Sequence, residues 1–376
     1  MSVQHLDSID PLRWARVAGL AKEMTLPLNG QCQLPAVVIQ AVCGDFVTPP
    51  LVAGRMSPSD SASVTATTPF LTASLTKPIV AMGVLMLVEQ GRFSLNDRLS
   101  TLLSQTFEDR VKSQITVRHL LTHTSGLPDL PHNNLELRQQ QAAPSAFVEA
   151  ALKSPLDFAP GHGLQYSSLG YALLGTLIEQ QTGRTCGTYL AESIFRPLGM
   201  TSTCLELPSY FGKEIALINP PEEQVGGDDW NWNSAYWRKF GAAWGGMIST
   251  TADLIRLSRM ILNGGQLDGV RFLSEATVQA AGTNQLHDFP NLPEADRRAR
   301  GWGLGWRSHW RSHAACFGDF LTPQAYGHWG ATGCLWWIDP HLNAAAVILS
   351  TQPLGQNFYP LTRLSNAVTA ACTSSR

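Results

Sequence analysis

The placement of strand-forming sequence constrains the fold of this chain more than any other feature. A short β-branched run lies near the N-terminus at Leu34–Val42, and two apolar runs lie near the C-terminus at Cys334–Ile338 and Ala344–Thr351. The residues between the last two, Asp339–Asn343, are typical of a turn, so the pair predicts an antiparallel hairpin. A sheet in this protein therefore has to be assembled from both ends of the chain.

Helical periodicity dominates the sequence between these ends. Within the middle of the chain, apolar spacing predicts helices at Val117–Thr122, Pro144–Leu152, Ser168–Gln181 and Thr188–Phe195. Outside it, helices are expected after the N-cap and proline pair Asp10-Pro11, and at Ser74–Glu89, Thr251–Leu262 and Leu361–Ala371. We expect an α/β sheet domain split between residues 1–89 and 235–376, a mostly helical insert at 90–234, and a mobile polar loop at 283–300.

Composition excludes several classes of partner. Charged residues make up 15% of the 376 residues, with 27 basic against 29 acidic side chains. This balance gives no electrostatic reason to bind nucleic acid or an anionic membrane. The longest apolar run, Pro78–Val88, is too short to cross a bilayer. We expect neither nucleic acid nor a membrane as partner, and the sequence leaves the oligomeric state open.

Cysteine usage and the first residues bear on the compartment. The seven cysteines show no CxxC spacing, and a chain of this size does not need disulfides for a stable core. Unpaired thiols and a reducing compartment are therefore expected. The opening MSVQHLDSIDPLRW has no basic segment followed by an apolar one, so no signal peptide is expected. Together these features predict a cytoplasmic protein.

An S-x-x-K motif, Ser74-Leu75-Thr76-Lys77, begins the helix expected at Ser74–Glu89. A lysine three residues after a serine lies one turn away on the same helix face. If its amine is buried, it can lose its proton and activate the serine hydroxyl as a nucleophile. The alternative is that Ser74 caps the helix and Lys77 is a solvated residue of the first turn.

Two further motifs follow in the chain. Tyr166-Ser167-Ser168 could supply a proton-shuttling phenol, provided that nearby cations lower its pKa, together with a small hydroxyl at Ser168. In His328-Trp329-Gly330, strand alternation places His328 and Gly330 on one face, and the N–H of the next residue, Ala331, could face an oxyanion. The structural alternatives are a helix N-cap at Ser167 or Ser168 and a strand-end histidine.

With their surrounding strings, these motifs resemble the serine β-lactamase-like family, which includes class C β-lactamases, DD-peptidases, D-aminopeptidases and esterases of the same fold. The resemblance spans roughly residues 34–350 and rests on the segments 70–78, 115–127, 160–171, 246–254 and 327–333. It implies a β-lactamase/DD-peptidase-like α/β (α+β) fold, with an antiparallel sheet flanked by helices and an all-helical insert domain. The active site should then lie in the cleft between the two parts.

The resemblance also implies roles for individual residues. Ser74 looks like the acylated nucleophile, Lys77 its activating partner and Tyr166 the general base and acid. The N–H groups of Ser74 and Ala331 look like the oxyanion hole. His328 stands where family β-lactamases usually have a lysine, and Ser168 where they usually have an asparagine. Both departures weigh against efficient β-lactam hydrolysis and leave acyl transfer possible; no cofactor is implied.

A pair of histidines and a cluster of tryptophans are two further features that could have a function. His119 and His123 have the i,i+4 spacing of a helical metal site, but no third ligand accompanies them, so hydrogen bonding at helix ends is preferred and no metal is expected. Ten of the eleven tryptophans follow residue 229. Core packing is favoured for most of them, whereas Trp244 and Trp329 adjoin family motifs and are candidates for the substrate pocket.

We therefore predict a serine hydrolase that works through an acyl-enzyme on a small ester or amide. A carboxylic ester with an apolar acyl group is the first choice, because esters need less leaving-group protonation than amides. A D-amino-acid amide or peptide comes second and weak β-lactamase activity third. The alternative from another class is a penicillin- or peptide-binding protein that does not turn over its ligand.

Overall fold

The computed structural model describes residues 9–27, 32–57, 61–209, 211–299, 301–310, 317–354 and 359–372. Most of the segment on which the signal-peptide expectation rests, Met1–Ser8, lies outside these ranges, as does Cys316. Every structural statement below concerns the described residues.

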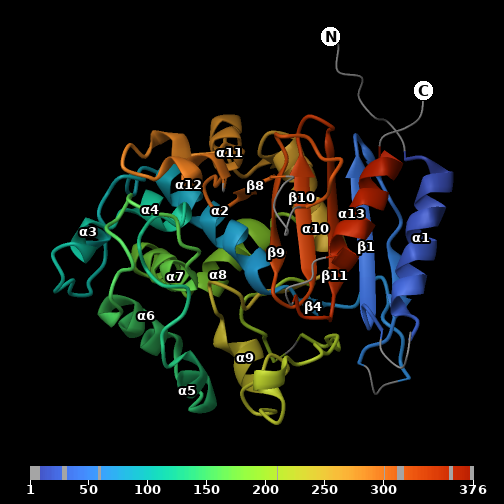
Figure 1. The fold of residues 1–376 in the computed structure, drawn as a ribbon, viewed down its shortest axis with the longest axis horizontal. Helices are drawn as coiled ribbons and strands as arrows, with labels where there is room; N and C mark the ends of the chain where they lie inside the picture. The colour runs from blue at the N-terminus through green and yellow to red at the C-terminus, as the bar shows by residue number, and fades with distance from the viewer. Residues whose placement is uncertain are drawn as a thin grey trace.

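A seven-stranded antiparallel sheet forms the centre of the molecule, and its strands come from both ends of the chain (Figure 1). Its order is β2 (Phe46–Val47), β1 (Ala36–Cys43), β11 (Ala344–Ser350), β10 (Cys334–Asp339), β9 (Tyr326–Gly330) and β8 (Arg307–Ser308), with β3 (Leu51–Gly54) also paired to β1. The N-terminal strand pairs along its length with the C-terminal hairpin, from Val37 opposite Ser350 to Cys43 opposite Ala344. The predicted α/β fold with an antiparallel sheet is confirmed.

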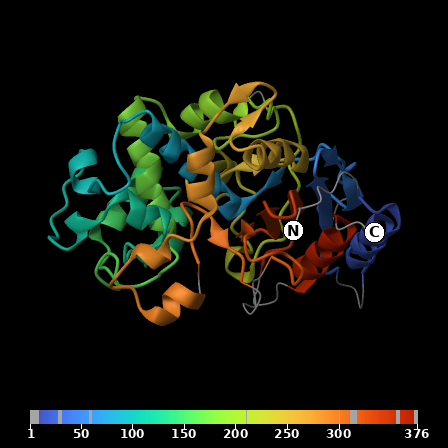
Figure 2. The ribbon, with the colours of Figure 1, turned by 90° about the horizontal axis from the view of Figure 1, so that it is seen from above.

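Helices cover both faces of this sheet, so its central strands are buried throughout. Helices α1 (Pro11–Thr25) and α13 (Tyr359–Cys372) pack side by side on one face, and α10 (Thr251–Leu262) covers the other (Figures 1 and 2). Neighbouring residues of β10 show the alternation. Trp336 donates its indole N–H to Ser258 of α10 at 2.8 Å, and Trp337 donates to Ser365 of α13 at 2.9 Å. Each central strand therefore contributes to two hydrophobic cores at once.

The middle of the chain is helical, as its periodicity predicts, and packs beside the sheet (Figure 2). Its helices are α3 (Leu99–Leu102), α4 (Val117–Leu121), α5 (Asn134–Gln139), α6 (Pro144–Lys153), α7 (Ser168–Thr182) and α8 (Cys186–Leu190), followed by a π-helical turn at Ala191–Phe195. Helix α7 is buried along most of its length and packs against α2 (Thr76–Glu89). The division into domains at residues 89/90 and 234/235 stays a prediction.

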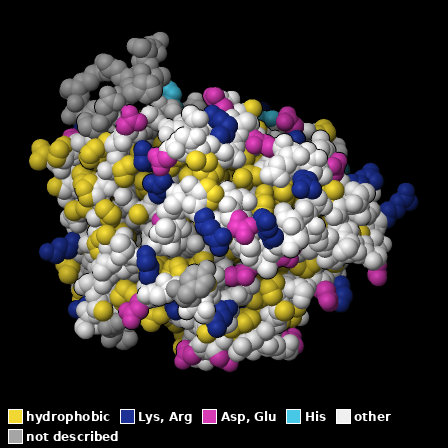
Figure 3. Space-filling model, turned by 180° about the vertical axis from the view of Figure 1, so that it is seen from behind, with side chains coloured by type: hydrophobic (Ala, Val, Ile, Leu, Met, Phe, Trp, Pro, Cys, Tyr) yellow, Lys and Arg dark blue, Asp and Glu magenta, His cyan; other side chains and the backbone are white. Residues whose placement is uncertain are grey.

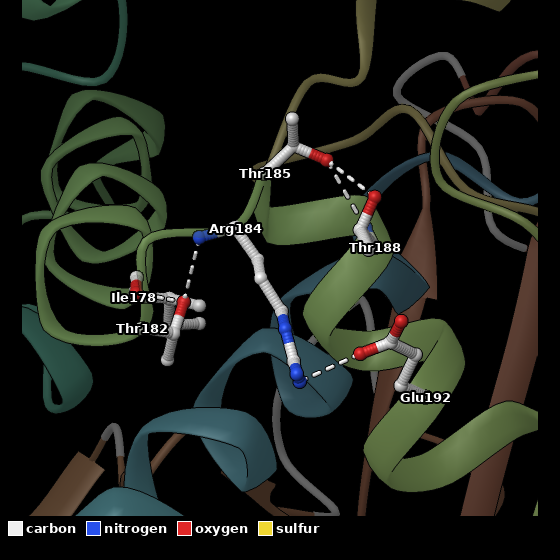
Figure 4. Close-up of polar contacts among 6 residues, drawn as sticks. All are labelled: Ile178, Thr182, Arg184, Thr185, Thr188 and Glu192. Atoms are coloured by element: carbon white, nitrogen blue, oxygen red, sulfur yellow. Dashed lines mark hydrogen bonds and ion pairs between the residues drawn. The ribbon is translucent and has the colours of Figure 1, made fainter.

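A helix cap and an ion pair stabilise the junction between α7 and α8 (Figure 4). Gly183 ends α7 with a left-handed backbone, φ +69°, and Thr185 caps α8 by accepting the N–H of Thr188 at 3.1 Å. Arg184 forms an ion pair of 2.6 Å with Glu192 on the following turn. The sharp turn lets α8 fold back and pack against α2.

Smaller elements complete the chain. They are β4 (Phe70–Leu71) paired with β5 (Ile248–Ser249), β6 (Gln266–Leu267) paired with β7 (Val270–Arg271), and helices α9 (Ala235–Phe240), α11 (Glu275–Gly282) and α12 (Glu294–Ala299). The last of these falls in the segment expected to be a mobile loop. That segment also contains a 3₁₀ turn at Leu286–Asp288, and its apolar residues Leu286, Phe289 and Leu292 pack with Trp302. The polar composition of residues 283–300 led to the prediction of a loop, although their few apolar residues form this small core.

One cysteine expectation is wrong. Cys43 at the end of β1 and Cys372 at the end of α13 form a disulfide that joins positions 329 residues apart. Cys32, Cys186, Cys204 and Cys334 are free. Because disulfides persist in oxidising compartments, this pair removes the cysteine argument for a reducing compartment. The cytoplasmic location remains a prediction.

The surface carries charges of both signs. On the face shown in Figure 3, cationic and anionic side chains are interspersed among apolar and neutral ones. Within the described ranges, no helix is both long and apolar enough to span a bilayer.

Substituting Ser258→Ala should lower the free energy of unfolding by about 1–3 kcal/mol, because it leaves the buried N–H of Trp336 without its acceptor. Urea unfolding would show a lower midpoint with an unchanged slope. Ser145→Ala, at an exposed position of α6, is the matched control and should leave the midpoint nearly unchanged. Equal midpoints for the two variants would contradict the assigned role of this hydrogen bond.

Candidate active site

Ser74 lies on a strained turn between a short strand and a long buried helix. Strand β4 leads into a 3₁₀ turn at Ala73–Leu75, and α2 begins only at Thr76, so Ser74 precedes the α-helix rather than opening it. Ala73 has φ +47°, a left-handed conformation that non-glycine residues rarely adopt. The hydroxyl of Thr76 donates to the Ala73 carbonyl at 2.6 Å and accepts the N–H of Met247 at 3.0 Å. These bonds hold the Ser74 turn against the neighbouring segment.

Lys77 lies beneath Ser74 with its amine fully buried. The Nζ atom donates to Ser74 Oγ at 3.2 Å, to Ser168 Oγ at 3.3 Å and to the carbonyl of Trp244 at 2.7 Å. Desolvation lowers the pKa of Lys77 from 10.5 to about 7, although the nearby carboxylate of Asp129 opposes the shift. A substantial fraction of this amine is therefore neutral near pH 7, so it can accept a proton from Ser74.

Tyr166 meets Ser74 and Lys77 from the loop before α7. Its phenol hydrogen-bonds Ser74, and its ring centre lies 4.6 Å from Lys77 Nζ. Burial raises the pKa of Tyr166 well above 10, and the hydrogen bond to Ser74 offsets only part of that rise. The condition that the sequence analysis set for a proton-shuttling tyrosine, a pKa lowered by cations, is therefore not met. At neutral pH Tyr166 is a neutral phenol, which can donate a proton.

The N-terminus of α7 places the third hydroxyl. Ser167 caps the helix by accepting the N–H of Gly170 at 3.0 Å, as the structural alternative for this motif expected. The backbone N–H of Ser168 donates to Asp129 Oδ1 at 2.9 Å, and its hydroxyl accepts a hydrogen bond from Lys77 Nζ at 3.3 Å. Asp129 thus links the α7 terminus to the electrostatics of Lys77. Sequence reasoning missed this residue, which follows the family-like segment 115–127 by two positions.

His328 lies behind the cavity wall rather than on it. It is buried, its Nδ1 lies 2.7 Å from the Trp329 carbonyl, and its Nε2 has no hydrogen-bond partner among the described residues. Desolvation, followed by the charge of Lys77, lowers the pKa of His328 to about 3, so the ring is neutral. His328 is not among the residues that line the cavity, and a substrate contact by it stays a prediction.

Gly330 serves the backbone rather than the substrate. A Cβ at this position would lie 2.2 Å from the carbonyl oxygen of Thr72, so only glycine lets β9 approach the turn that carries Ser74. Like His328, Gly330 is not among the residues that line the cavity, whereas its neighbours Trp329 and Ala331 are. Close packing of these two segments brings Ala331 and Ser74 to one cavity.

His119 and His123, whose spacing resembles that of a metal site, instead form hydrogen bonds with backbone groups at helix ends, as the sequence analysis preferred. His119 accepts the N–H of Thr116 at 3.1 Å within a capping box. His123 has φ +59° and accepts the N–H of Ser167 through Nδ1 at 3.0 Å. Its ring centre lies 4.7 Å from that of Tyr166. His123 therefore helps to position the phenol, a role that sequence reasoning missed.

These groups open onto a cavity of about 470 Å³. Its lining is Ala73, Ser74, Asp129, Leu130, Asn134, Arg138, Leu164, Tyr166, Ser168, Trp232, Trp237, Trp244, Gly245, Trp302, Arg307, Trp329, Ala331 and Leu354. These residues come from both the sheet and the helical block. The sequence analysis expected the site in a cleft between these two parts. Trp244 and Trp329 line the cavity as expected, and so do Trp232, Trp237 and Trp302, for which core packing was favoured.

A model of the Beta-lactamase family matches residues 41–370. The chain belongs to the Beta-lactamase family. A relative from Escherichia coli O157:H7, named as D-alanyl-D-alanine carboxypeptidase, is 28% identical over 71% of this chain and 65% of its own length. The chain thus spans about 65% of the length of the curated relatives it matches.

Solved structures of the same fold cover nearly all of this Beta-lactamase family chain. A penicillin-binding protein homolog from Caulobacter crescentus has a TM-score of 0.77 at 22% identity and covers 97% of this chain and 99% of its own. EstCE1, a hydrolase with promiscuous acyltransferase activity, has a TM-score of 0.74 at 19% identity, covering 95% and 98%. At these identities the likeness establishes the fold.

Gly330→Ala should slow covalent labelling of Ser74 by a serine-reactive probe by at least about 100-fold, because the added Cβ displaces β9 from the Ser74 turn. The test is the rate of labelling by a fluorescent penicillin or fluorophosphonate, with circular dichroism to verify the fold. Gly19→Ala is the control, since its Cβ meets nothing within 4 Å and it should stabilise α1 by about 0.5–1 kcal/mol. An unchanged labelling rate in Gly330→Ala would contradict the assigned packing role.

Proposed function

We propose that this protein hydrolyses carboxylic esters with apolar acyl groups through a covalent acyl-enzyme on Ser74. The observation that carries the proposal is the contact of Ser74 Oγ with a buried lysine amine, 3.2 Å away, whose pKa is about 7. A serine hydroxyl beside a neutral amine has the base it needs to act as a nucleophile at neutral pH. Membership of a family of serine hydrolases supports the same chemistry.

Each residue then has a defined part in acylation. Lys77 takes the Ser74 proton as Oγ bonds to the acyl carbon, and the N–H groups of Ser74 and Ala331 stabilise the oxyanion. The C–O bond to the leaving group breaks, and the proton passes through the Tyr166 phenol to the leaving oxygen. In deacylation, water attacks the acyl carbon, its proton returns to Ser74 Oγ through the same groups, and the acid is released.

An ester is favoured over a β-lactam by the residues around the site. Five tryptophans line the cavity, which suits an apolar acyl group. His328 is neutral and lies behind the wall, so it does not supply the cation that a lysine at this position brings to family β-lactamases. Ser168 has a hydroxyl in place of the usual asparagine amide. An alkoxide or phenoxide leaving group also needs less protonation than an amine.

A D-amino-acid amide or peptide is the second candidate. Asp129 and Arg307 line the same cavity, so the site has one side chain for an ammonium group and one for a carboxylate. The relatives named as D-alanyl-D-alanine carboxypeptidase support a substrate of this class. A protein that is acylated without turnover is the remaining alternative, and transient kinetics separate it from an enzyme.

Ser74→Ala should reduce p-nitrophenyl butyrate hydrolysis by at least about 1,000-fold, because the covalent route is lost. Stopped-flow measurement on the wild type should show turnover after any burst, and the exposed Ser145→Ala variant should match the wild type. Substantial activity in Ser74→Ala would overturn the proposed nucleophile. A stoichiometric burst without turnover would instead identify a binding protein.

The pH dependence should report Lys77. Its pKa of about 7 means that the amine is protonated and inactive as a base at low pH, so kcat/KM should rise with pH through about 7. The raised pKa of Tyr166 keeps the phenol neutral, so the profile should stay level from about pH 8 to 9. Lys77→Arg should lose this inflection along with most activity. A wild-type profile that is flat from pH 5 to 9 would contradict the assignment.

A further inference from the structure

A second set of polar groups lines the active-site cavity on its helical wall. Asn134 and Arg138 lie one turn apart on α5, and both line the cavity that contains Ser74. Their side chains therefore face the same space. Neither takes part in the acyl-transfer chemistry described above.

Arg138 is buried without a carboxylate partner. Its side chain is 6% exposed, and within the described ranges no acidic side chain lies at ion-pair distance from it. Nη2 donates to Gln224 Oε1 at 3.2 Å and to the Trp230 carbonyl at 3.4 Å, while Nε has no hydrogen-bond partner. The guanidinium stacks over Trp237 at 4.5 Å. Burying an unpaired cation costs free energy, and the aromatic contact offsets only part of it.

The charge persists at neutral pH. Burial lowers the pKa of Arg138 to about 10, opposed by Tyr236 and Glu223, so the guanidinium stays protonated in the range where the enzyme would work. Because Nη2 already donates to two acceptors and Nε is buried, Nη1 is the guanidinium nitrogen left to donate to a ligand carboxylate, and the side-chain amide of Asn134 can add a second hydrogen bond.

An aromatic wall, of which Trp237 and Trp244 line the cavity and Phe240 contacts both, connects this cation to the catalytic groups. Trp237 stacks on Phe240 at 5.5 Å, and Phe240 contacts the ring of Trp244 at 5.6 Å. The carbonyl of Trp244 accepts the hydrogen bond from Lys77. A ligand with its reactive carbonyl at Ser74 and an apolar chain along this wall would bring the other end of the chain to Arg138.

We propose that Arg138, assisted by Asn134, binds a carboxylate at the distal end of the acyl group, so that the preferred substrates are monoesters of aliphatic dicarboxylic acids. This inference rests on the acyl-hydrolase function proposed above and names its substrate class. The bound carboxylate supplies an acidic group at ion-pair distance, which the guanidinium lacks among the described residues, where Glu223 acts on it only from farther away.

Mono-4-nitrophenyl adipate and 4-nitrophenyl hexanoate test this subsite, because they share a six-carbon acyl chain and differ in the terminal carboxylate. After correction for uncatalysed hydrolysis, kcat/KM should favour the adipate ester by at least tenfold in the wild type. Arg138→Met should lower that ratio at least tenfold, and Arg138→Lys, which keeps the charge without the planar fork, should retain part of the preference. Thermal unfolding verifies that each variant folds.

The control is Arg184→Met, which removes the same side chain from the surface ion pair with Glu192 shown in Figure 4 and should leave the ratio unchanged. Equal rates for the two esters in the wild type, or a ratio unaffected by Arg138→Met, would overturn the proposal. So would a ratio lost in Arg307→Met and kept in Arg138→Met, since the carboxylate would then bind at the sheet side of the cavity.

If neither ester is turned over, the acyl-hydrolase function fails and the subsite is tested by binding alone. Calorimetry should then show adipate binding to the wild-type protein, at least tenfold weaker binding to Arg138→Met, and an unchanged affinity for Arg184→Met. Absence of adipate binding, or equal binding by the wild type and Arg138→Met, would overturn the subsite.

Discussion

The buried amine of Lys77 is the interaction on which the rest of the site depends. It reaches Ser74 in the same turn, Ser168 at the start of α7, and the backbone of Trp244, so it joins three segments that are far apart in the chain. An ammonium group this deep is costly unless it is hydrogen-bonded, and a lowered pKa is the alternative to holding the charge. The protein uses both: the acceptors fix the position of Nζ, and desolvation leaves much of it neutral near pH 7. Positioning and basicity thus have a common cause in burial.

The sheet supplies the rigidity that this arrangement needs. Its central strands are buried on both faces, and the adjacent indoles of Trp336 and Trp337 are each anchored to a serine of a covering helix. Strand β9 is held in that framework and meets the Ser74 turn at Gly330, where the two backbones come closer than a Cβ would allow. The helical block is positioned from the other side, through α7 and the Ser168 to Asp129 hydrogen bond. The cavity lies where the sheet meets the helical block.

How far the sequence could predict this structure depends on the range of each interaction. Local signals succeeded: Asp10 caps α1 as expected, α10 spans Thr251–Leu262, and the C-terminal hairpin lies where two apolar runs and the turn between them placed it. The motifs led to Ser74, Lys77 and Tyr166, which the fold brings together.

Predictions that depended on tertiary packing did worse. The Cys43–Cys372 disulfide joins residues with no local relation. Trp237 and Trp302 line the cavity only because of how the helical block and the segment 283–302 pack. The pKa of Tyr166 rises because burial outweighs the neighbouring charges, and sequence does not report burial of a loop residue. The sequence around Arg138 on the short helix α5 did not indicate that this side chain would be buried without an ion-pair partner.

The neutral state of His328 affects the charge balance around Lys77. A lysine at this position, as in related β-lactamases, would put a second cation beside Lys77. Because the coulombic effect of each cation lowers the pKa of the other, the same burial would then have to accommodate two charges. An imidazole with a pKa of about 3 avoids this, so in the proposed mechanism proton transfer rests with Lys77 and Tyr166, both of which can be neutral near pH 7. Recognition of a substrate anion then falls to cations away from the catalytic amine. Arg307 lines the sheet side of the cavity and Arg138 its helical wall. From Arg138, the contacts of Trp237 and Phe240 lead to Trp244, whose carbonyl accepts a hydrogen bond from Lys77. In the proposed complex the substrate anion would lie at Arg138, so its charge would raise the pKa of Lys77 less than an anion beside the amine would.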